Sequence, residues 1–167
     1  MTFSHRTLKE EDAGAVCGFA RSADELFFAF PKATFPLAPD VLLAAARQRL
    51  EPTVALCDGK VVGYANFIKV KERGFCAIGN LMVHPDHRRQ GVAAYLVNVM
   101  MRKAFETYCA RFVRAACFSH NQAAYQLYHG LGFKPGEMEQ RATADGTAVL
   151  LVNLYLHRRK VSCDDTP

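Results

Sequence analysis

The residues from Leu81 to Ala93 have the types and the spacing that could bind an anion. A hydrophobic run ending at Val83 is followed by a basic loop, and Gly91 then precedes a long segment with apolar residues at helical spacing. The first N–H groups of a helix lack intrahelical partners and carry a partial positive charge, so a phosphate binds well there. Gly91 lets an anion approach the backbone, and Arg88 and Arg89 add charge that does not titrate near neutral pH. The stretch predicts a phosphate site; the alternative is an ordinary strand, loop and helix with exposed arginines.

The loop matches neither of two familiar nucleotide-binding patterns, because it lacks the Gly-Lys-Ser/Thr of a P-loop and the three spaced glycines of a dinucleotide fingerprint. Its Arg88-x-x-Gly91-x-Ala93 pattern instead resembles the Arg/Gln-x-x-Gly-x-Gly/Ala signature of the GNAT superfamily of acyl-CoA-dependent N-acyltransferases. A later segment, Asn121-x-x-Ala124-x-x-Leu127-Tyr128-x-x-x-Gly132-Phe133, is similar to that family's second cofactor motif. The resemblance spans nearly the whole chain and is strongest from Cys76 to Phe133.

The resemblance implies where an acyl donor, expected to be acetyl-CoA, would bind. The backbone of Leu81 and Val83 would pair with the pantetheine amides, and the Leu81 N–H would face the thioester oxygen, where attack creates negative charge. The backbone of residues 88–94 would hold the pyrophosphate, and Asn121 would bond the pantetheine arm or the adenosine side. No metal is expected. The predicted donor-binding residues are Leu81, Met82, Val83, Arg88, Arg89, Gln90, Gly91, Val92, Ala93, Ala94 and Asn121.

Tyr128 matches the position of the family's usual general acid. A phenol with a pKa of about 10 can protonate a departing CoA thiolate, whose pKa is about 8.5, and a helix would fix its direction. One alternative is that Tyr128 is a core aromatic whose hydroxyl bonds some neighbour. Tyr125, one helical turn earlier, is the second candidate, although packing is its expected role.

No general base is identified from the sequence, although a primary amine must lose a proton before it attacks. The positions that match the family's catalytic glutamates are Ala77 for some members and Ala116 for those that acetylate protein N-termini. A water chain is the simplest substitute, with four titratable side chains in reserve: Glu72, His84, His120 and Glu139. Ala116 also makes a small amine a better predicted substrate than a protein N-terminus.

Substrate choice in the family depends on the first two helices, their connection and the final hairpin. Here the segment from Asp24 to Pro31 combines carboxylates with phenylalanines. Glu25 could attract an amine, and Phe27 and Phe28 could form an apolar wall of its site. The alternative is a flap packed on the sheet with its charges in solvent.

The hydrophobic pattern predicts the elements that would position these residues. Strands are predicted over residues 3–8, 53–57, 61–70, 75–83, 113–118, 134–141 and 148–156, and helices over 9–21, 40–50, 91–108 and 121–131. Three prolines predict an irregular connection over residues 27–39. This order predicts one α/β (α+β) domain, residues 1–160, with a mixed, mostly antiparallel sheet, followed by a polar tail, residues 161–167. The resemblance adds helices on both faces and a splay between the fourth and fifth strands.

Composition narrows the possible function classes. A net charge of +5 favours an anionic ligand, but the interleaved aromatic and basic residues of base stacking are lacking, so we expect no nucleic-acid partner. No apolar run is long enough for a membrane span, the N-terminus is polar, and the six cysteines lack metal-binding spacing. Together these features predict a cytoplasmic protein with no membrane partner. The C-terminal strands and the Phe-rich connection are candidate homodimer surfaces.

The combined prediction is an N-acetyltransferase that moves an acetyl group from acetyl-CoA to an amine by direct transfer in a ternary complex. Two alternatives stay open. One is an acyltransferase that uses a different acyl-CoA, and the other is a non-catalytic acyl-CoA sensor, which would bind CoA without turnover. The presence of Tyr128 favours an enzyme.

Overall fold

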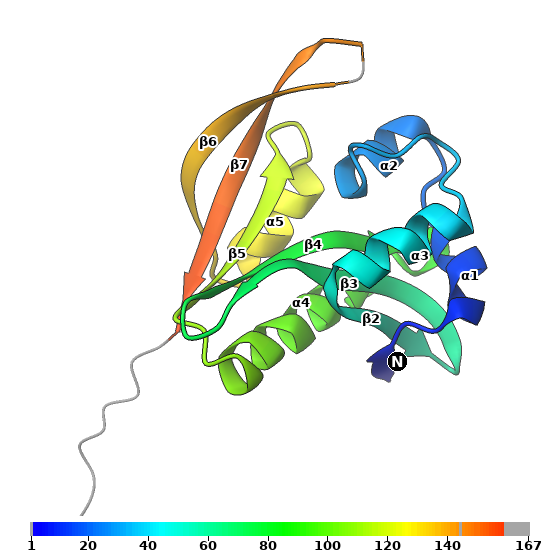
Figure 1. Ribbon diagram of the computed structural model, residues 1–167, viewed down its shortest axis with the longest axis horizontal. Coiled ribbons are helices and arrows are strands. Elements are labelled where there is room, and N and C mark those ends of the chain that lie inside the picture. The colour runs from blue at the N-terminus through cyan, green and yellow to red at the C-terminus, as the bar shows by residue number, and fades with distance from the viewer. Residues whose placement is uncertain (1, 144, 159–167) are drawn as a thin grey trace, which may run out of the picture.

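The computed structural model describes residues 2–143 and 145–158 and places them in a mixed seven-stranded sheet (Figure 1). The strand order is β1-β2-β3-β4-β5-β7-β6. Neighbouring strands are antiparallel except β4 and β5, which are parallel, so the predicted mixed sheet is confirmed. The strand bounds are β1 Phe3–Thr7, β2 Leu50–Cys57, β3 Lys60–Lys71, β4 Phe75–Val83, β5 Phe112–Phe118, β6 Lys134–Ala142 and β7 Ala148–His157.

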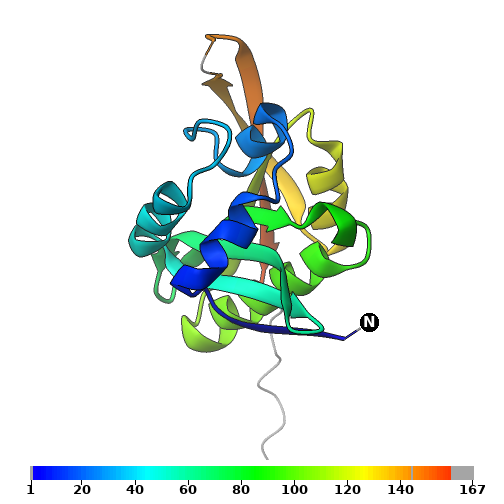
Figure 2. The ribbon, with the colours of Figure 1, turned by 90° about the vertical axis from the view of Figure 1, so that its right-hand side faces the viewer.

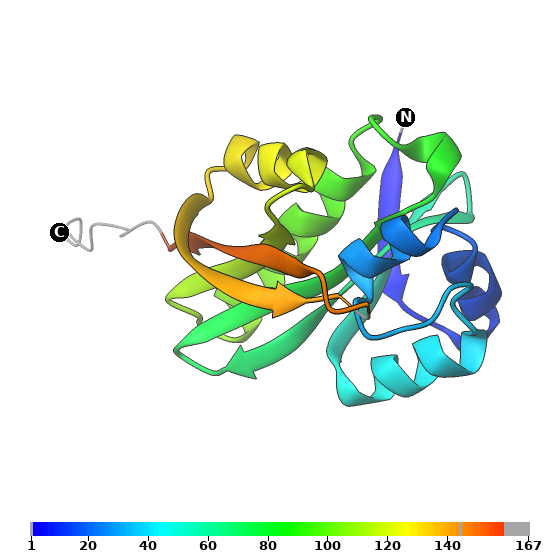
Figure 3. The same ribbon diagram turned by 90° about the horizontal axis from the view of Figure 1, so that it is seen from above.

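Helices lie on both sides of the sheet, as Figures 2 and 3 show. One set comprises α4, Val92–Arg102, which continues into a π-helical turn at Lys103–Thr107, and α5, Gln122–Gly130. The other set comprises α1, Ala13–Cys17, α2, Ala23–Ala29, and α3, Pro39–Gln48. Each set buries its own apolar cluster against the sheet, one around Leu96 and Met100 and the other around Leu26 and Leu42. Because α4 joins β4 to β5, it is the crossover that a parallel pair of strands requires.

The structure corrects the predicted elements that precede β2. The single helix predicted over residues 9–21 is wrong, because a short 3₁₀ turn leads into α1, which ends at Cys17. Part of the predicted irregular connection is also wrong, because α2 continues through residues 27–29. Ser22 explains where α2 begins, since its side-chain oxygen accepts a hydrogen bond from the Glu25 N–H at 3.2 Å. The helix ends just before the first proline of the segment, which disfavours helical backbone in the residue before it.

The strands β4 and β5 separate after a short paired region, as predicted. Their pairing covers only residues 75–77 of β4 with residues 112–114 of β5. Farther along β4 the register against β3 shifts, and Asn80 lies in the shift with a φ of +52°. Such a bulge bends a strand and increases its twist, which turns β4 away from β5. The β5-facing edge of β4 after Ala77 therefore has no strand partner among the described residues.

Some predictions concern residues outside the described ranges. The polar tail at residues 161–167 lies there, and so does Cys163. The five cysteines that the structure describes are free thiols. Within residues 2–143 and 145–158, no helix is long and apolar enough to cross a membrane.

Candidate active site

A groove of about 310 Å³ lies where β4, α2 and the start of α5 meet. It is lined by donor-binding residues predicted on β4 and in the following loop, by Asn121, and by two residues predicted for the acceptor side. The structure therefore brings both halves of the predicted site to one place. The lining residues are Phe19, Glu25, Phe28, Ala29, Leu81, Met82, Val83, Arg88, Asn121 and Ala123.

The loop between β4 and α4 presents its backbone rather than its side chains. Gly91 is the N-cap of α4 with a φ of +91°, and Arg89 has a φ of +57°. In the described part of the chain, no N–H group from residue 89 to residue 94 has a hydrogen-bond partner. Successive N–H groups in such left-handed turns form a concave anion site, and the α4 dipole adds to it. This backbone arrangement is suited to a phosphate, and phosphate binding here stays a prediction.

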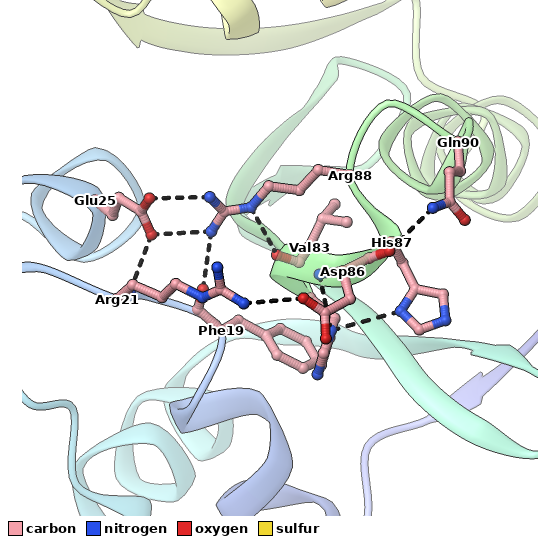
Figure 4. Close-up of polar contacts among 9 residues, drawn as sticks. Phe19, Arg21, Glu25, Val83, Asp86, His87, Arg88 and Gln90 are labelled. Carbon is pink, nitrogen blue, oxygen red and sulfur yellow. Dashed lines mark hydrogen bonds and ion pairs between the residues drawn. The ribbon is translucent and has the colours of Figure 1, made fainter.

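The side chains of this loop are mostly engaged within the protein. Gln90 donates its amide to the carbonyl oxygen of Asp86 at 2.9 Å, and Val92 is buried in the core. Arg88 donates from both terminal nitrogens to the carboxylate of Glu25, at 2.9 Å each (Figure 4). The pKa of Glu25 is lowered from 4.5 to about 2, chiefly by the hydrogen bonds from Arg88 and to a smaller extent by the Arg21 N–H, which donates to the same carboxylate. Glu25 and Arg88, predicted for different ligands, are therefore partners of each other.

Tyr128 lies on the face of α5 that packs into the core, and it does not line the groove. Its side chain is 4% exposed and its ring packs against Phe133 with centroids 5.4 Å apart. No described residue forms a hydrogen bond with its hydroxyl, whose pKa is raised by burial and by the nearby Cys117 thiol. The hydroxyl therefore stays protonated near neutral pH and is able to donate. Tyr125 is half-buried and stacks on His129 with centroids 6.1 Å apart.

The remaining predicted residues are placed as follows. The side-chain oxygen of Asn121 caps α5 by accepting from the Ala124 N–H at 3.2 Å, so its amide nitrogen is left to donate. Phe28 lines the groove, but Phe27 does not, because its ring stacks on Phe118 with centroids 4.5 Å apart. Glu25 is the one carboxylate among the groove-lining residues. No group of three or more His, Cys, Asp or Glu side chains able to hold a metal occurs in the described residues.

A chain of amides at the β4 bulge was not foreseen from the sequence. The Asn80 amide donates to the carbonyl oxygen of Ala29 at 2.7 Å, and the Asn66 amide donates to the Asn80 oxygen at 3.0 Å and to the Tyr64 hydroxyl at 2.9 Å. Asn66 is fully buried, and its own side-chain oxygen has no partner among the described residues. The available signal was an Asn after Gly79 inside an apolar strand, since both residues favour a bulge and Asn tolerates positive φ.

Comparison with known families identifies the chain. Residues 9–133 match the sequence model of the Acetyltransferase (GNAT) family. The chain belongs to the GNAT acetyltransferase family. It is therefore a GNAT N-acetyltransferase, and the resemblance carried by the two motifs is confirmed.

Solved GNAT structures have the same fold as this chain. The protein yncA from Salmonella typhimurium, described as an acetyltransferase and solved with its cofactor acetyl-CoA, superimposes with a TM-score of 0.74 at 21% identity over 99% of both chains. The ribosomal-protein-S18-alanine N-acetyltransferase from Escherichia coli gives a TM-score of 0.73 at 19% identity, covering 99% of this chain and 100% of that one. An N-acetyltransferase from Staphylococcus aureus Mu50 gives 0.74 at 20% identity, covering 94% of this chain and 99% of that one. At these identities the likeness establishes the fold.

Proposed function

We propose that this GNAT enzyme transfers the acetyl group of acetyl-CoA directly to a small primary amine bound in the same complex. The observation that carries the proposal is the meeting of two backbone features beside one groove. Among the described residues, the β5-facing edge of β4 has no strand partner after Ala77, and the N–H groups of residues 89–94, in the following loop and the first turn of α4, have no hydrogen-bond partner. Acetyl-CoA has amides along its pantetheine arm and an anionic pyrophosphate farther along, so it matches both features in order.

The donor side has separate roles for its backbone and side chains. The N–H groups of residues 89–94 and the positive end of α4 would hold the pyrophosphate, with charge added by Arg89. The edge of β4 would pair with the pantetheine amides, and the Leu81 N–H would stabilise the negative charge that develops on the thioester oxygen. The amide nitrogen of Asn121 would bond the pantetheine arm. The charge of Arg88 is already balanced by Glu25.

Tyr128 is proposed as the proton donor to the departing sulfur. Burial raises its pKa, so the hydroxyl is protonated throughout the range in which the enzyme would work. The same burial makes the phenol a weaker acid, so its main contribution would be a hydrogen bond that strengthens as negative charge develops on the sulfur.

The acceptor side favours an uncharged amine as the attacking species. Phe28 and Ala29 give the groove an apolar wall, and the Glu25 carboxylate is paired with Arg88 rather than open to an ammonium group. With no second carboxylate among the lining residues, the amine proton would leave through water, which makes the rate rise as pH approaches the pKa of the amine. Family members that acetylate protein N-termini have a glutamate at the position that matches Ala116. Its replacement by alanine here supports a small amine as the substrate.

Thermal unfolding in the presence of nucleotides tests the donor site. A ligand at about 100 times its Kd stabilises a protein by about 2.7 kcal/mol, which is a shift of several degrees for a domain of this size. We expect a shift with acetyl-CoA and with CoA, and none with ATP or NAD. No shift at saturating acetyl-CoA would overturn the proposal.

Turnover tests the second half of the proposal. A panel of primary amines, with an N-terminal peptide among them, is incubated with acetyl-, propionyl- or succinyl-CoA, and the released thiol is measured. We expect release with acetyl-CoA and at least one small amine. Binding of CoA without release for any amine or donor would indicate a sensor instead of an enzyme.

A further inference from the structure

The loop that would hold the pyrophosphate is joined to α2 by a charged cluster (Figure 4). Besides its two bonds to Glu25, Arg88 donates to the carbonyl oxygen of Phe19 at 2.9 Å and to that of Val83 at 3.4 Å. Four of the five N–H groups of this guanidinium are thereby used by oxygens of the protein. A paired, planar guanidinium of this kind has a fixed direction, and here that direction is toward α2.

A second pair crosses the same junction close by. Arg21, which precedes α2, forms an ion pair with Asp86 of the loop at 2.9 Å, and its N–H donates to Glu25 at 2.9 Å. Both side chains of the Arg21–Asp86 pair are largely exposed, so this pair contributes little by itself. The Arg88–Glu25 pair has two aligned bonds and less exposure, so it is the main connection between the loop and α2.

The other end of α2 is attached to the bulge of β4. The carbonyl oxygen of Ala29, the last residue of α2, accepts from the Asn80 amide. Because a carbonyl only accepts, this bond orients Asn80, and Asn80 in turn orients Asn66. The helix is thus fixed to both parts of the β4 region on which the proposed function depends, the bulge beside Leu81 and the phosphate-binding loop.

We propose that Glu25 and Arg88 are positioning residues that couple the acceptor side of the groove to the donor site. This inference rests on the proposed function. A donor that orders the loop would, through Arg88 and Glu25, also order α2 and with it the wall formed by Phe28 and Ala29. The amine site is then complete only when the donor is bound, and by linkage a bound amine strengthens donor binding by the same factor.

The competing role for Arg88 is direct binding of phosphate, and the two roles predict opposite effects of one substitution. If Glu25 merely holds Arg88 away from phosphate, Glu25→Gln releases the guanidinium and CoA binds about tenfold more tightly or better. If the pair positions α2, Glu25→Gln leaves the Kd of CoA within about threefold of wild type while α2 loosens. Adding Arg88→Gln to Glu25→Gln then changes little more, because the two residues act as one unit.

Hydrogen exchange read by mass spectrometry, with CoA as the probe, measures the coupling. The proteins are wild type, Glu25→Gln, Arg88→Gln, the double variant and Asp24→Asn. The last of these removes an exposed carboxylate from the same turn of α2, and this carboxylate forms no hydrogen bond with another described residue. In wild type and Asp24→Asn, we expect CoA to slow exchange both at residues 88–94 and at residues 23–30. In Glu25→Gln we expect CoA still to slow exchange at residues 88–94 but no longer at residues 23–30, where the amides should exchange about tenfold faster than in wild type.

The outcomes separate this inference from the proposed function. If CoA protects neither segment of the wild-type protein, the proposed donor site is wrong. The measurement without CoA still tests the junction, because Glu25→Gln must speed exchange at residues 23–30 more than Asp24→Asn does. Equal α2 exchange in these two variants overturns the coupling. So does tighter CoA binding by Glu25→Gln, which assigns Arg88 to phosphate. If the KM for the amine rises in Glu25→Gln while kcat is unchanged, the result supports a positioning role for Glu25. General destabilisation of the protein would not change KM and leave kcat unaffected.

Discussion

The two sides of the groove are built from different parts of the chain. The donor side consists of one continuous stretch, the edge of β4 and the loop up to α4, and it presents backbone groups. The acceptor side consists of α2, whose position depends on side chains from separate regions: Arg88 in the loop, Asn80 in the bulge and Phe118 at the end of β5.

This difference determines how each side responds to substitution. A site made of N–H groups depends on backbone conformation, so it tolerates many side chains but not a change where φ is positive. A site made by a docked helix depends on several contacts at once, so each substitution has a smaller effect and neighbouring substitutions are not additive. The donor side should therefore fail sharply at single positions, and the acceptor side gradually at several.

The largest effect is expected for Gly91→Val on the donor side. A side chain at a φ of +91° is strained, and relief of that strain would rotate the N–H groups that follow. A Cβ there meets only Phe3, at 3.9 Å, so the fold should survive. Losing two charge-assisted bonds weakens CoA binding by about 1,000-fold, measured by calorimetric titration.

Gly59→Val is the matched control for this prediction. Gly59 lies in the turn between β2 and β3 with a φ of +77°, and no heavy atom lies within 4 Å of an added Cβ. The Gly59→Val substitution therefore introduces the same kind of backbone strain away from the groove, and CoA should bind to this variant as tightly as to wild type. Equal CoA affinity of Gly91→Val and wild type would show that the donor side does not depend on this backbone conformation.

The next effect is expected for Tyr128→Phe. Removing a proton donor typically lowers kcat by about 100-fold, while the Kd of CoA should stay unchanged because the hydroxyl has no role in the ground state. Stability should change by less than about 0.5 kcal/mol, since no described residue bonds the hydroxyl. Tyr125→Phe is the matched variant one turn earlier and should keep wild-type turnover; the reverse pattern would assign the acid to Tyr125.

A smaller effect on the acceptor side is expected for Asn80→Gly. Glycine keeps the backbone at positive φ and removes only the amide that holds Ala29, so α2 loses its second attachment. Unfolding in urea should show a loss of about 1–2 kcal/mol, because the Asn66 amide also loses an acceptor. The amine kcat/KM should fall by about tenfold with CoA affinity unchanged. An equal loss in CoA affinity would mean that the two sides of the groove are not separately built.

How far the sequence predicted each side follows from the same difference. The sheet, the parallel pair and the phosphate loop depend on short-range patterns: alternating apolar residues, a glycine before a helical repeat, and motifs that lie within about 15 residues. These were predicted, with β2 extending back to Leu50 rather than beginning at residue 53.

The features that were not predicted depend on contacts between distant residues. Glu25 and Arg88 were each assigned a ligand, because their charges are visible in the sequence but a pairing across 63 residues is not. The helix α2 was not predicted at any of its residues, because the aromatic run with its prolines favours irregular structure, whereas Ser22 and packing of Leu26 determine a helix. The Asn66–Asn80 chain needs the register of β3 against β4, which no local pattern specifies.

The smallest effect, and the one that isolates the junction between the two sides, is the pH dependence contributed by Glu25. Its pKa is about 2 in the folded protein, against an ordinary value of 4.5, so the pair stabilises the fold above pH 4.5 and loses this effect as pH falls toward 2. The side chains of Arg88 and Glu25 are both more than a third exposed. Solvent screening therefore limits the contribution of this pair to the free energy of unfolding to about 1 kcal/mol.

Comparison of variants removes the other titrating groups, among them Asp12, whose pKa is also lowered by its arginine partner. In urea unfolding at pH 7, Glu25→Gln should be about 1 kcal/mol less stable than Asp24→Asn, and the gap should close between about pH 4.5 and pH 2. High salt should shrink the gap at pH 7 because the pair is partly exposed. A gap that does not vary with pH would mean that the Glu25 charge does not hold α2 to the loop, and the two sides would then be joined by packing alone.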